Sequence, residues 1–354
     1  MSDLSQHLKA RIAADGPLTV ADYMAECLLH PTQGYYTTRD PLGEAGDFTT
    51  SPEISQMFGE MIGLCLAQTW MSQGEPDQIL LAELGPGRGT LMNDILRSTK
   101  SIDGFHSALK IHLIEASEPL RARQADALAE YDVTWHRQVT SLPDRPLYLV
   151  ANEFFDALPI RQFIRSKGAT WCERRIGWQD ETLRFGLNDP QEIESLAGRL
   201  ADTKTGDMVE ICAAATSITQ EIATRISAYG GAALFIDYGD WRSLGDTFQA
   251  ISAHEKVPPL TTPGQADLTA HVDFEALSEA AKGCTVSKMI PQGVFLERLG
   301  ITPRARKLAL NLAGPALTSH VAAHRRLTHP KEMGNLFKVL SLTPRGQAAP
   351  PGLE

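Results

Sequence analysis

Three glycines at alternate positions, Gly85, Gly87 and Gly89, directly follow an apolar run that is typical of a buried strand. A helix-like segment, residues 91–97, comes next. In α/β proteins, a strand, a glycine turn and a helix bring backbone N–H groups close to a ligand. Three glycines in five residues destabilise a chain unless positive φ angles or a close approach require them. The segment therefore predicts a ligand-binding loop, and the alternative is a glycine-rich turn without a ligand.

The spacing of this loop and the acid before it indicate which ligand it binds. The dinucleotide fingerprint is G-x-G-x-x-G, whereas this loop reads G-x-G-x-G, and no Gly-Lys-Ser/Thr of a P-loop follows. Glu83 lies two residues before the first glycine, where a carboxylate disfavours a phosphate and tolerates an amino group and a sulfonium. The pattern E-x-G-x-G-x-G resembles motif I of the class I S-adenosylmethionine (SAM) methyltransferases. This resemblance implies that the loop faces the methionine part of SAM.

A second acid, Glu115, ends the strand-like segment 111–115. In nucleotide-binding folds, an acid about 20 residues beyond the glycines binds the ribose hydroxyls. The alternative is a solvated acid before a helix that Ser117 caps. The predicted cofactor-binding residues are Glu83, Gly85, Pro86, Gly87, Gly89, Thr90 and Glu115.

Asn152 and Glu153 directly follow another strand-like run, residues 147–151. Ligands of open α/β sheets bind beyond the carboxyl ends of the strands. A carboxylate at Glu153 can grip a guanidinium in bidentate fashion or orient a nitrogen lone pair toward a methyl carbon. The alternative is a helix cap with an acid in its first turn. Asp156, one turn further, either shares the site or is solvated, so the catalytic candidates are Asn152, Glu153 and Asp156.

Three further segments supply candidate substrate contacts at the same edge. The loop 46–53 combines polar groups with a helix start, a second segment ends a strand near residue 237, and a third carries an acid–His–acid pattern. Their alternatives are an ordinary capped helix, a tyrosine that covers an edge, and a histidine that is satisfied in a loop. No H-E-x-x-H or G-x-S-x-G motif occurs, so no metal site and no hydrolase triad are predicted. The substrate candidates are Asp47, Ser51, Glu53, Tyr238 and His271.

Composition excludes several functional classes. The 354 residues carry a net charge of −10, which argues against non-specific nucleic-acid binding. No run of 18 or more apolar residues suggests a transmembrane helix, so no membrane insertion is expected. The five cysteines are scattered and form no C-x-x-C pair, which fits a reducing compartment.

Strand-like and helix-like runs alternate from about residue 79, which predicts a parallel sheet. Residues 1–75 read as an N-terminal helical cap, 76–345 as the main domain, and 346–354 as a flexible tail. Insertions are expected at about 160–208, with two antiparallel strands around a turn, and at 240–275, as a loop-rich lid. The candidate strands are 79–83, 110–115, 133–135, 147–151, 232–237, 285–289 and 336–342.

Several segments together are similar to the MidA family of SAM-dependent methyltransferases, which includes the mitochondrial complex I assembly arginine methyltransferase. The similarity extends over roughly residues 15–342. The matching segments are 46–53, 83–90, 152–159, 236–239, 245–247, 267–274 and 333–340.

The resemblance implies an α/β fold of the class I SAM-methyltransferase (Rossmann-like) type. This fold has a seven-stranded, mostly parallel sheet, an N-terminal helical region and an inserted β-rich subdomain. SAM is the implied cofactor, and the implied activity is protein arginine N-methylation linked to respiratory complex I assembly, with the 49-kDa-type subunit as the protein partner. The alternatives are a small-molecule N- or O-methyltransferase and a SAM-binding assembly chaperone with little turnover.

The sequence also departs from related enzymes. It lacks the paired-glutamate loop of the main protein arginine methyltransferases, so Glu153 needs another acid, either Asp156 or Glu53, to hold a guanidinium. Residues 135–141 offer no acid for the adenine. The N-terminus does not resemble a mitochondrial presequence, so a bacterial cytoplasmic member is expected. The oligomeric state is open, with a homodimer as one option.

Overall fold

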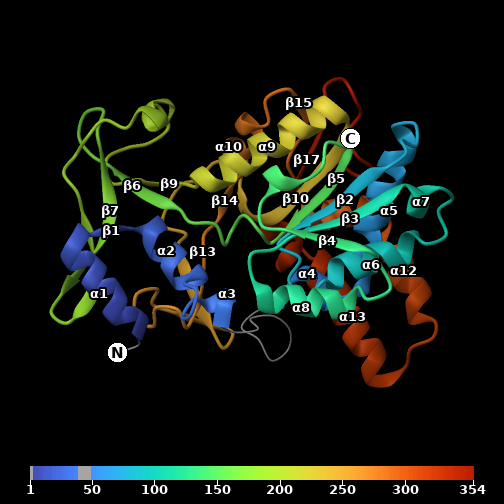
Figure 1. Ribbon diagram of the computed structural model, residues 1–354, viewed down its shortest axis with the longest axis horizontal. Helices are drawn as coiled ribbons and strands as arrows, with labels where there is room; N and C mark the ends of the chain where they lie inside the picture. Colours follow the sequence, from blue (N-terminus) through green and yellow to red (C-terminus); the bar gives the residue numbers. More distant parts are fainter. Residues whose placement is uncertain (1–2, 39–48) are drawn as a thin grey trace. The chain divides into compact units, whose positions relative to one another are not determined.

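The computed structural model describes residues 3–38 and 49–354 (Figure 1). The chain divides into two compact units. Unit 1 comprises residues 1–41, 156–215 and 242–273, and unit 2 comprises 42–155, 216–241 and 274–354. Each unit is therefore assembled from stretches that are far apart in the sequence. The segment 1–75, which the sequence predicts to be one helical cap, contributes to both units.

Unit 2 is built on a mixed sheet in the order β15-β17-β10-β5-β2-β3-β4. Neighbouring strands from β10 to β4 are parallel, whereas β17 is antiparallel to both β10 and β15. Each of the seven candidate strands has a counterpart here, and the short strand β16 (Ile290–Pro291) also pairs with β17. The strands are β2 (Ile79–Leu84), β3 (Leu109–Ile114), β4 (Val133–His136), β5 (Leu147–Asn152), β10 (Gly231–Asp240), β15 (Cys284–Val286) and β17 (Phe337–Pro344).

The central strands are apolar because both of their faces are covered. Every residue of β2 and of β5 is buried, as expected for strands of a parallel sheet. The register pairs Leu84 of β2 with Ile114 of β3 and with Ala151 of β5. The carboxyl ends of these three strands therefore meet at one edge of the sheet.

Helices α5 (Gln56–Ser72) and α6 (Thr90–Thr99) pack together over one face of this sheet. Their close approach depends on two glycines of α5. A Cβ atom at Gly59 would lie 2.5 Å from the Cβ atom of Asp94, and one at Gly63 would lie 2.8 Å from the Ser98 hydroxyl. The other helices of this unit include α4 (Ser51–Ile54), α7 (Phe105–Ala108), α8 (Glu118–Ala127), α10 (Phe274–Ala280), α11 (Gln292–Arg298), α12 (Ile301–Ala309), α13 (Gly314–Thr328) and α14 (Met333–Leu336).

The C-terminal residues 346–354, which composition predicts to be a flexible tail, are held against unit 2. Leu353 is buried in the same hydrophobic core as α5 and α6. The Arg298 guanidinium donates a hydrogen bond to the carbonyl oxygen of Gly352 at 3.1 Å. Burial of Leu353 and the hydrogen bond from Arg298 thus hold this segment in place, although its proline-rich composition predicts a flexible tail.

Unit 1 contains a five-stranded sheet with the core path β1-β7-β6-β9. The predicted hairpin around Lys167-Gly168 is confirmed, because β6 and β7 pair antiparallel with Arg165 opposite Trp171. Thr19 caps the following helix through a capping box with Asp22. The elements are α1 (Asp3–Asp15), β1 (Leu18–Thr19), α2 (Val20–Leu29), α3 (Tyr35–Thr38), β6 (Arg161–Arg165), β7 (Trp171–Gln179), β8 (Thr182–Leu187) and β9 (Met208–Ile211).

The segment 240–275, expected to be a loop-rich lid, contains regular structure. Strands β11 (Gln249–Ser252), β12 (Glu255–Val257) and β13 (Asp267–Thr269) form an antiparallel sheet in the order β12-β11-β13. Apolar residues of these strands, including Ala250 and Leu268, are buried in a core shared with α1 and α2. The strands are too short for their pattern to stand out among the surrounding prolines and glycines. Among the described residues, every helix is too short or too polar to cross a membrane.

Candidate functional site

The glycine loop joins the end of β2 to the start of α6. Gly85, Gly87 and Gly89 all have positive φ angles, of 60°, 55° and 84°, which favour glycine. The Gly85 N–H donates to the Ile114 carbonyl oxygen at 3.0 Å, and the Gly89 N–H donates to the Pro86 carbonyl oxygen at 2.8 Å. A Cβ atom at Gly85 would lie only 2.9 Å from the ring of Phe154. Backbone conformation explains all three glycines, and a close approach adds to this constraint at Gly85.

Glu83 lies in β2, two residues before this loop, and is 3% exposed. Its side chain accepts a hydrogen bond from the backbone N–H of Met92 in the first turn of α6. Its Oε2 atom has no hydrogen-bond partner among the described residues. Burial, opposed by the Met92 N–H and reinforced by the negative charge of Glu115, raises the pKa of Glu83 to about 8. A buried acceptor without a donor suits a ligand that brings a cationic donor.

Glu115 follows β3 and is held by groups from α8. Its Oε1 atom accepts the Ser117 N–H at 2.7 Å, and its Oε2 atom accepts the Gln124 amide at 3.2 Å. Burial raises the pKa of Glu115, although these hydrogen bonds oppose the shift. Ser117 also caps α8, as in the alternative reading of the sequence, while the contact of Glu115 with a ribose stays a prediction. Each carboxylate oxygen can accept more than one hydrogen bond, so Glu115 keeps capacity for hydroxyl donors.

Gln124, which the sequence analysis did not single out, connects the glycine loop to Glu115. It is fully buried, and its Nε2 atom also donates to the Gly87 carbonyl oxygen at 2.8 Å. Its Oε1 atom accepts from the indole N–H of Trp135 at 2.9 Å. The amide is therefore fixed between α8, β4 and the loop. A glutamine on a polar helix carries no sequence signal of this role.

Glu153 forms a strained turn at the end of β5. Its φ angle of 51° is in the left-handed region, which is uncommon for a residue with a side chain. Its N–H donates to the Ile236 carbonyl oxygen at 2.9 Å. Its Oε1 atom accepts the Ser51 N–H at 2.7 Å and the Asn152 amide at 3.1 Å. The side chain is thereby aimed by two donors, one from α4 and one from its own neighbour.

The electrostatic surroundings of Glu153 are mixed. Burial raises the pKa of this carboxyl group, while the hydrogen bonds from Ser51 and Asn152 and the positive charge of Arg326 oppose the shift. The net direction is a raised pKa. The Asn152 Oδ1 atom is buried and has no partner within residues 3–38 and 49–354. Glu153 and Asn152 thus present acceptor oxygens that can hold a donor-rich cation.

Asp237 holds the turn that contains Glu153. It is fully buried at the carboxyl end of β10, and its Oδ2 atom accepts the N–H groups of Phe154 at 3.1 Å and Phe155 at 2.9 Å. In the sequence, Asp237 is recognisable only as the end of a strand. An acid inside an otherwise apolar strand was the available signal of this role.

Two substrate candidates of unit 2 lie close to this turn or to the loop. The Glu53 Oε1 atom accepts a hydrogen bond from the Thr90 hydroxyl at 2.5 Å, which connects α4 to the first residue of α6. Ser51 contributes the backbone N–H already described.

Tyr238 is buried, and its ring packs edge-on against Phe337 with ring centroids 5.5 Å apart. Tyr238 therefore has a packing role, and its contact with substrate stays a prediction.

The remaining candidates do not belong to the described part of unit 2. Asp156 and His271 lie in unit 1, where the Asp156 carbonyl oxygen accepts the Ala270 N–H and the His271 N–H donates to the Thr247 hydroxyl, both at 2.9 Å. Their participation in the site stays a prediction. Asp47 lies outside the described residues.

Within the described residues, one group has the composition of a metal site. His7, Glu26 and His30 of unit 1 bring ligand atoms within 4.8 Å of one another. The Arg11 guanidinium, however, donates to the Glu26 Oε1 atom at 2.8 Å. This cation competes with a metal ion for the one carboxylate of the group, and the absence of a metal site stays a prediction.

Comparison with known sequences points to one family. A sequence profile of a family described as S-adenosyl-L-methionine-dependent methyltransferases matches residues 61–291, which is more than half of the chain. The chain is 36% identical to the mitochondrial protein arginine methyltransferase NDUFAF7 of Xenopus laevis, over 97% of this chain and 85% of the relative. It is 35% identical to the human protein of that name, over 97% of this chain and 84% of the relative.

Comparison with solved structures agrees. The fold is similar to that of a Burkholderia thailandensis protein that is described as a methyl transferase and is bound to S-adenosyl-homocysteine. The TM-score is 0.84 at 28% identity, over 99% of this chain and 94% of that chain. A second structure from Burkholderia thailandensis gives a TM-score of 0.80 at 28% identity, over 99% of this chain and 93% of that chain.

Proposed function

The chain belongs to the family of S-adenosyl-L-methionine-dependent methyltransferases, and we propose that it methylates arginine side chains of a protein. The predicted family resemblance and the predicted cofactor, SAM, are confirmed by these matches. The proposed site consists of the glycine loop, Glu83 and Glu115 for the cofactor, and Asn152 and Glu153 for the methyl acceptor.

The observation that carries the proposal is the position of Glu153. This carboxylate follows β5 at the sheet edge where the glycine loop follows β2, and two donors fix it there. The relatives named as protein arginine methyltransferases align over nearly the whole chain. A guanidinium is the substrate group that a fixed carboxylate binds best, through two parallel N–H···O bonds.

The residues of the loop fit the cofactor. SAM, when bound, supplies a methyl group on a sulfonium. The unpartnered Oε2 atom of Glu83 provides an acceptor for the amino group of SAM. Glu115, held by Ser117 and Gln124, provides acceptor capacity for the ribose hydroxyls. The backbone of Gly85 and Gly87 admits a ligand that no residue with a side chain would allow so close.

Glu153 has two tasks in this proposal. It accepts an N–H of the guanidinium and so fixes the orientation of the attacking nitrogen, which accelerates transfer through alignment. It also takes the proton that the guanidinium loses when the nitrogen gains the methyl group. The raised pKa of Glu153 favours this acceptance of a proton. Glu53, bonded to Thr90 beside the loop, is the proposed second acid.

Further features stay predictions of the family resemblance. We propose the class I, Rossmann-like arrangement of seven strands, which the strand order β15-β17-β10-β5-β2-β3-β4 supports. The first candidate substrate is a complex I subunit of the 49-kDa type, in keeping with a role in complex I assembly. The cytoplasmic location and the oligomeric state also stay predictions.

A transfer assay with two readouts tests the proposal. Purified protein is incubated with methyl-labelled SAM and a cell extract, and the labelled products are hydrolysed and identified. Label is expected on arginine side chains of protein. Glu153→Gln should lower the transfer rate about 100-fold or more, because a preorganised charge at the reacting group is lost, while calorimetry shows unchanged SAM affinity. Label on small molecules alone, or equal transfer by the variant, would contradict the proposal.

A further inference from the structure

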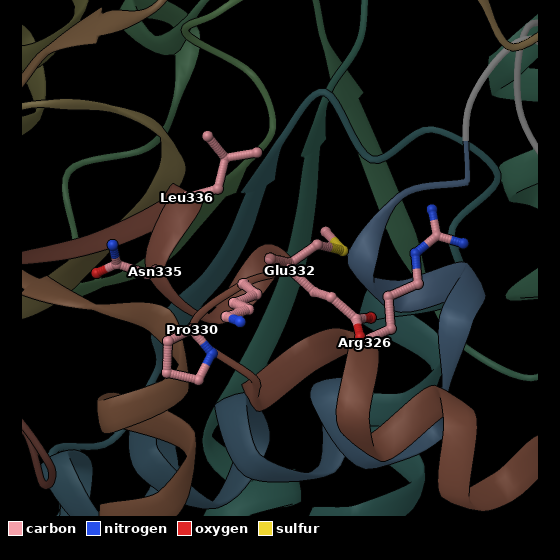
Figure 2. Close-up of a pocket in the computed structure, with 7 residues that line it drawn as sticks. Arg326, Pro330, Glu332, Asn335 and Leu336 are labelled. Atoms are coloured by element: carbon pink, nitrogen blue, oxygen red, sulfur yellow. The ribbon is translucent and has the colours of Figure 1, made fainter.

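A pocket of about 550 Å³ opens between the end of α13 and the start of β17 in unit 2 (Figure 2). Two cationic residues, Arg326 and Lys331, contribute to its lining, together with the apolar residues Pro330, Met333 and Leu336. The pocket therefore combines positive charge with an apolar surface, a composition that suits an acidic side chain on an aliphatic stem.

The pocket lies at the same edge of the sheet as Glu153. The register pairs Phe337, the first residue of β17, with Tyr238 near the carboxyl end of β10. The Glu153 N–H donates to Ile236, two residues earlier on β10. Leu336, which lines the pocket, directly precedes β17. The pairing of β17 with β10 thus places the pocket at the edge of the unit 2 sheet that also carries Glu153.

Arg326 connects the pocket to the turn that contains Glu153. It lies in the last turn of α13, and its positive charge acts on Glu153. Helix α13 packs against α4, whose Ser51 N–H holds the Glu153 carboxylate. In Figure 2 the Arg326 side chain points away from Asn335 and Leu336. One side of the pocket therefore borders the proposed acceptor site.

Within the described residues, the two cations of the pocket lining outnumber its one acid. Glu332 also lines it, but its Oε1 atom accepts a hydrogen bond from Arg325 at 2.8 Å. Neither Arg326 nor Lys331 forms an ion pair in residues 3–38 and 49–354. The carboxyl end of α13 favours a cation at Arg326. Because Lys331 lies beyond that helix, the helix end alone does not account for both cations.

We propose that this pocket binds an acidic side chain of the protein substrate, close in sequence to the arginine that is methylated. The inference rests on the proposed function, since it assigns a recognition role to the same site. Arg326 and Lys331 bind the carboxylate, and the apolar lining receives the aliphatic stem. Recognition of a flanking acid selects among the many arginines that a protein surface presents.

The test uses fluorescent peptides and protein loaded with S-adenosylhomocysteine. Each peptide has one central arginine, with Asp, Asn or Lys at a single flanking position, and binding is measured by anisotropy at low salt. One Asp peptide should bind about fivefold more tightly than its Asn counterpart, as expected for a solvent-accessible charge pair. In the double variant Arg326→Glu/Lys331→Glu, the order should invert in favour of Lys.

A matched control and a check of folding keep the result interpretable. Arg345 is an exposed cation just beyond the opposite end of β17, so Arg345→Glu should preserve the preference of the wild type. Arg326 and Lys331 are exposed, and SAM affinity verifies that the double variant is folded. The inference is overturned if no Asp position is preferred, or if the wild type and the double variant rank the peptides alike.

Methylation of the same peptides separates this inference from the proposed function. Binding that depends on the flanking charge, without methylated arginine, would contradict the function and support the pocket. Methylated arginine without any dependence on flanking charge would support the proposed function and contradict the proposed role of the pocket. Absence of both binding and methylation would also contradict the proposed role of the pocket.

Discussion

Gly85 carries a tighter steric constraint than Gly89 in the glycine loop. We expect Gly85→Ala to lower SAM affinity by more than about tenfold, because the new Cβ would displace the Phe154 ring at a residue with a φ angle of 60°. Gly74→Ala is the matched control, since Gly74 has a φ angle of 86° and no atom near its Cβ position. Calorimetry with SAM should show an unchanged affinity for the control. Equal affinities of the two variants would refute the placement of the loop.

Glu83 should make the stability of the ligand-free protein depend on pH. Its folded-state pKa of about 8 lies above the ordinary value of 4.5, so the folded protein keeps a proton that the unfolded chain releases. The free energy of unfolding should therefore fall as the pH rises from about 5 to 8. The cationic amino group of SAM favours the carboxylate, so stabilisation by SAM should increase over the same window.

Melting temperatures across this pH range, with and without SAM, measure the effect of Glu83. The variant Glu83→Gln carries no titrating group at this position and should lose this part of the pH dependence. If wild type and variant show the same slope, burial of Glu83 does not control its protonation.

Glu83, Glu115 and Glu153 were recognisable in the sequence because each acid ends or follows an apolar run. Gln124 and Asp237 were not identified as contributors to the site, although both hold it in place. Both roles depend on contacts between residues that are far apart in the chain. For Asp237 the local signal was an acid inside an apolar strand, and for Gln124 no local pattern indicated the contact.

Among the elements, α5 is linked to α6 and α12 by one buried acid in addition to the apolar core that the three helices share. Glu60 is 2% exposed and accepts hydrogen bonds from Arg97 of α6 at 3.1 Å and from Arg304 of α12 at 2.6 Å. Burial raises the pKa of Glu60, but the hydrogen bonds from Arg304 and Arg97 outweigh it, and the net pKa is lowered. The carboxylate therefore stays charged between the three helices.

We expect Glu60→Gln to reduce the free energy of unfolding by about 1–3 kcal/mol, because Arg97 and Arg304 lose the buried carboxylate that they share. Urea denaturation measures this loss. The control is Glu118→Gln, which removes an ion pair to Arg137 whose side chains are 64% and 70% exposed, and it should change stability by less than about 0.5 kcal/mol. Similar losses for both variants would show that the helices do not depend on the Glu60 network.

The strands of the main sheet were predictable because their burial produces continuous apolar runs. The strands β11, β12 and β13 were not, since they have three or four residues each and lie among prolines and glycines. The C-terminal tail was also misjudged, because a single leucine, Leu353, anchors it in the core. Short elements derive their order from tertiary contacts, which local composition does not report.

At the scale of the whole molecule, the division into two units could not be read from chain order. Unit 1 is assembled from three separate stretches, and one boundary falls between Phe155 and Asp156, inside a motif that the sequence suggested to be a single site. The family was predictable from the same motifs and is confirmed by the relatives. The sequence motifs therefore identify the family, but they do not predict how the chain divides into two units.

The central claim concerns which molecules receive the methyl group. Quantitative mass spectrometry of methylated arginine, in cells with and without this protein, tests that claim directly. At least one protein arginine should lose its methylation in cells that lack the chain. Wild-type protein should restore the mark, and the Glu153→Gln variant should not. An identical set of methylated arginines in both cell types would contradict the account.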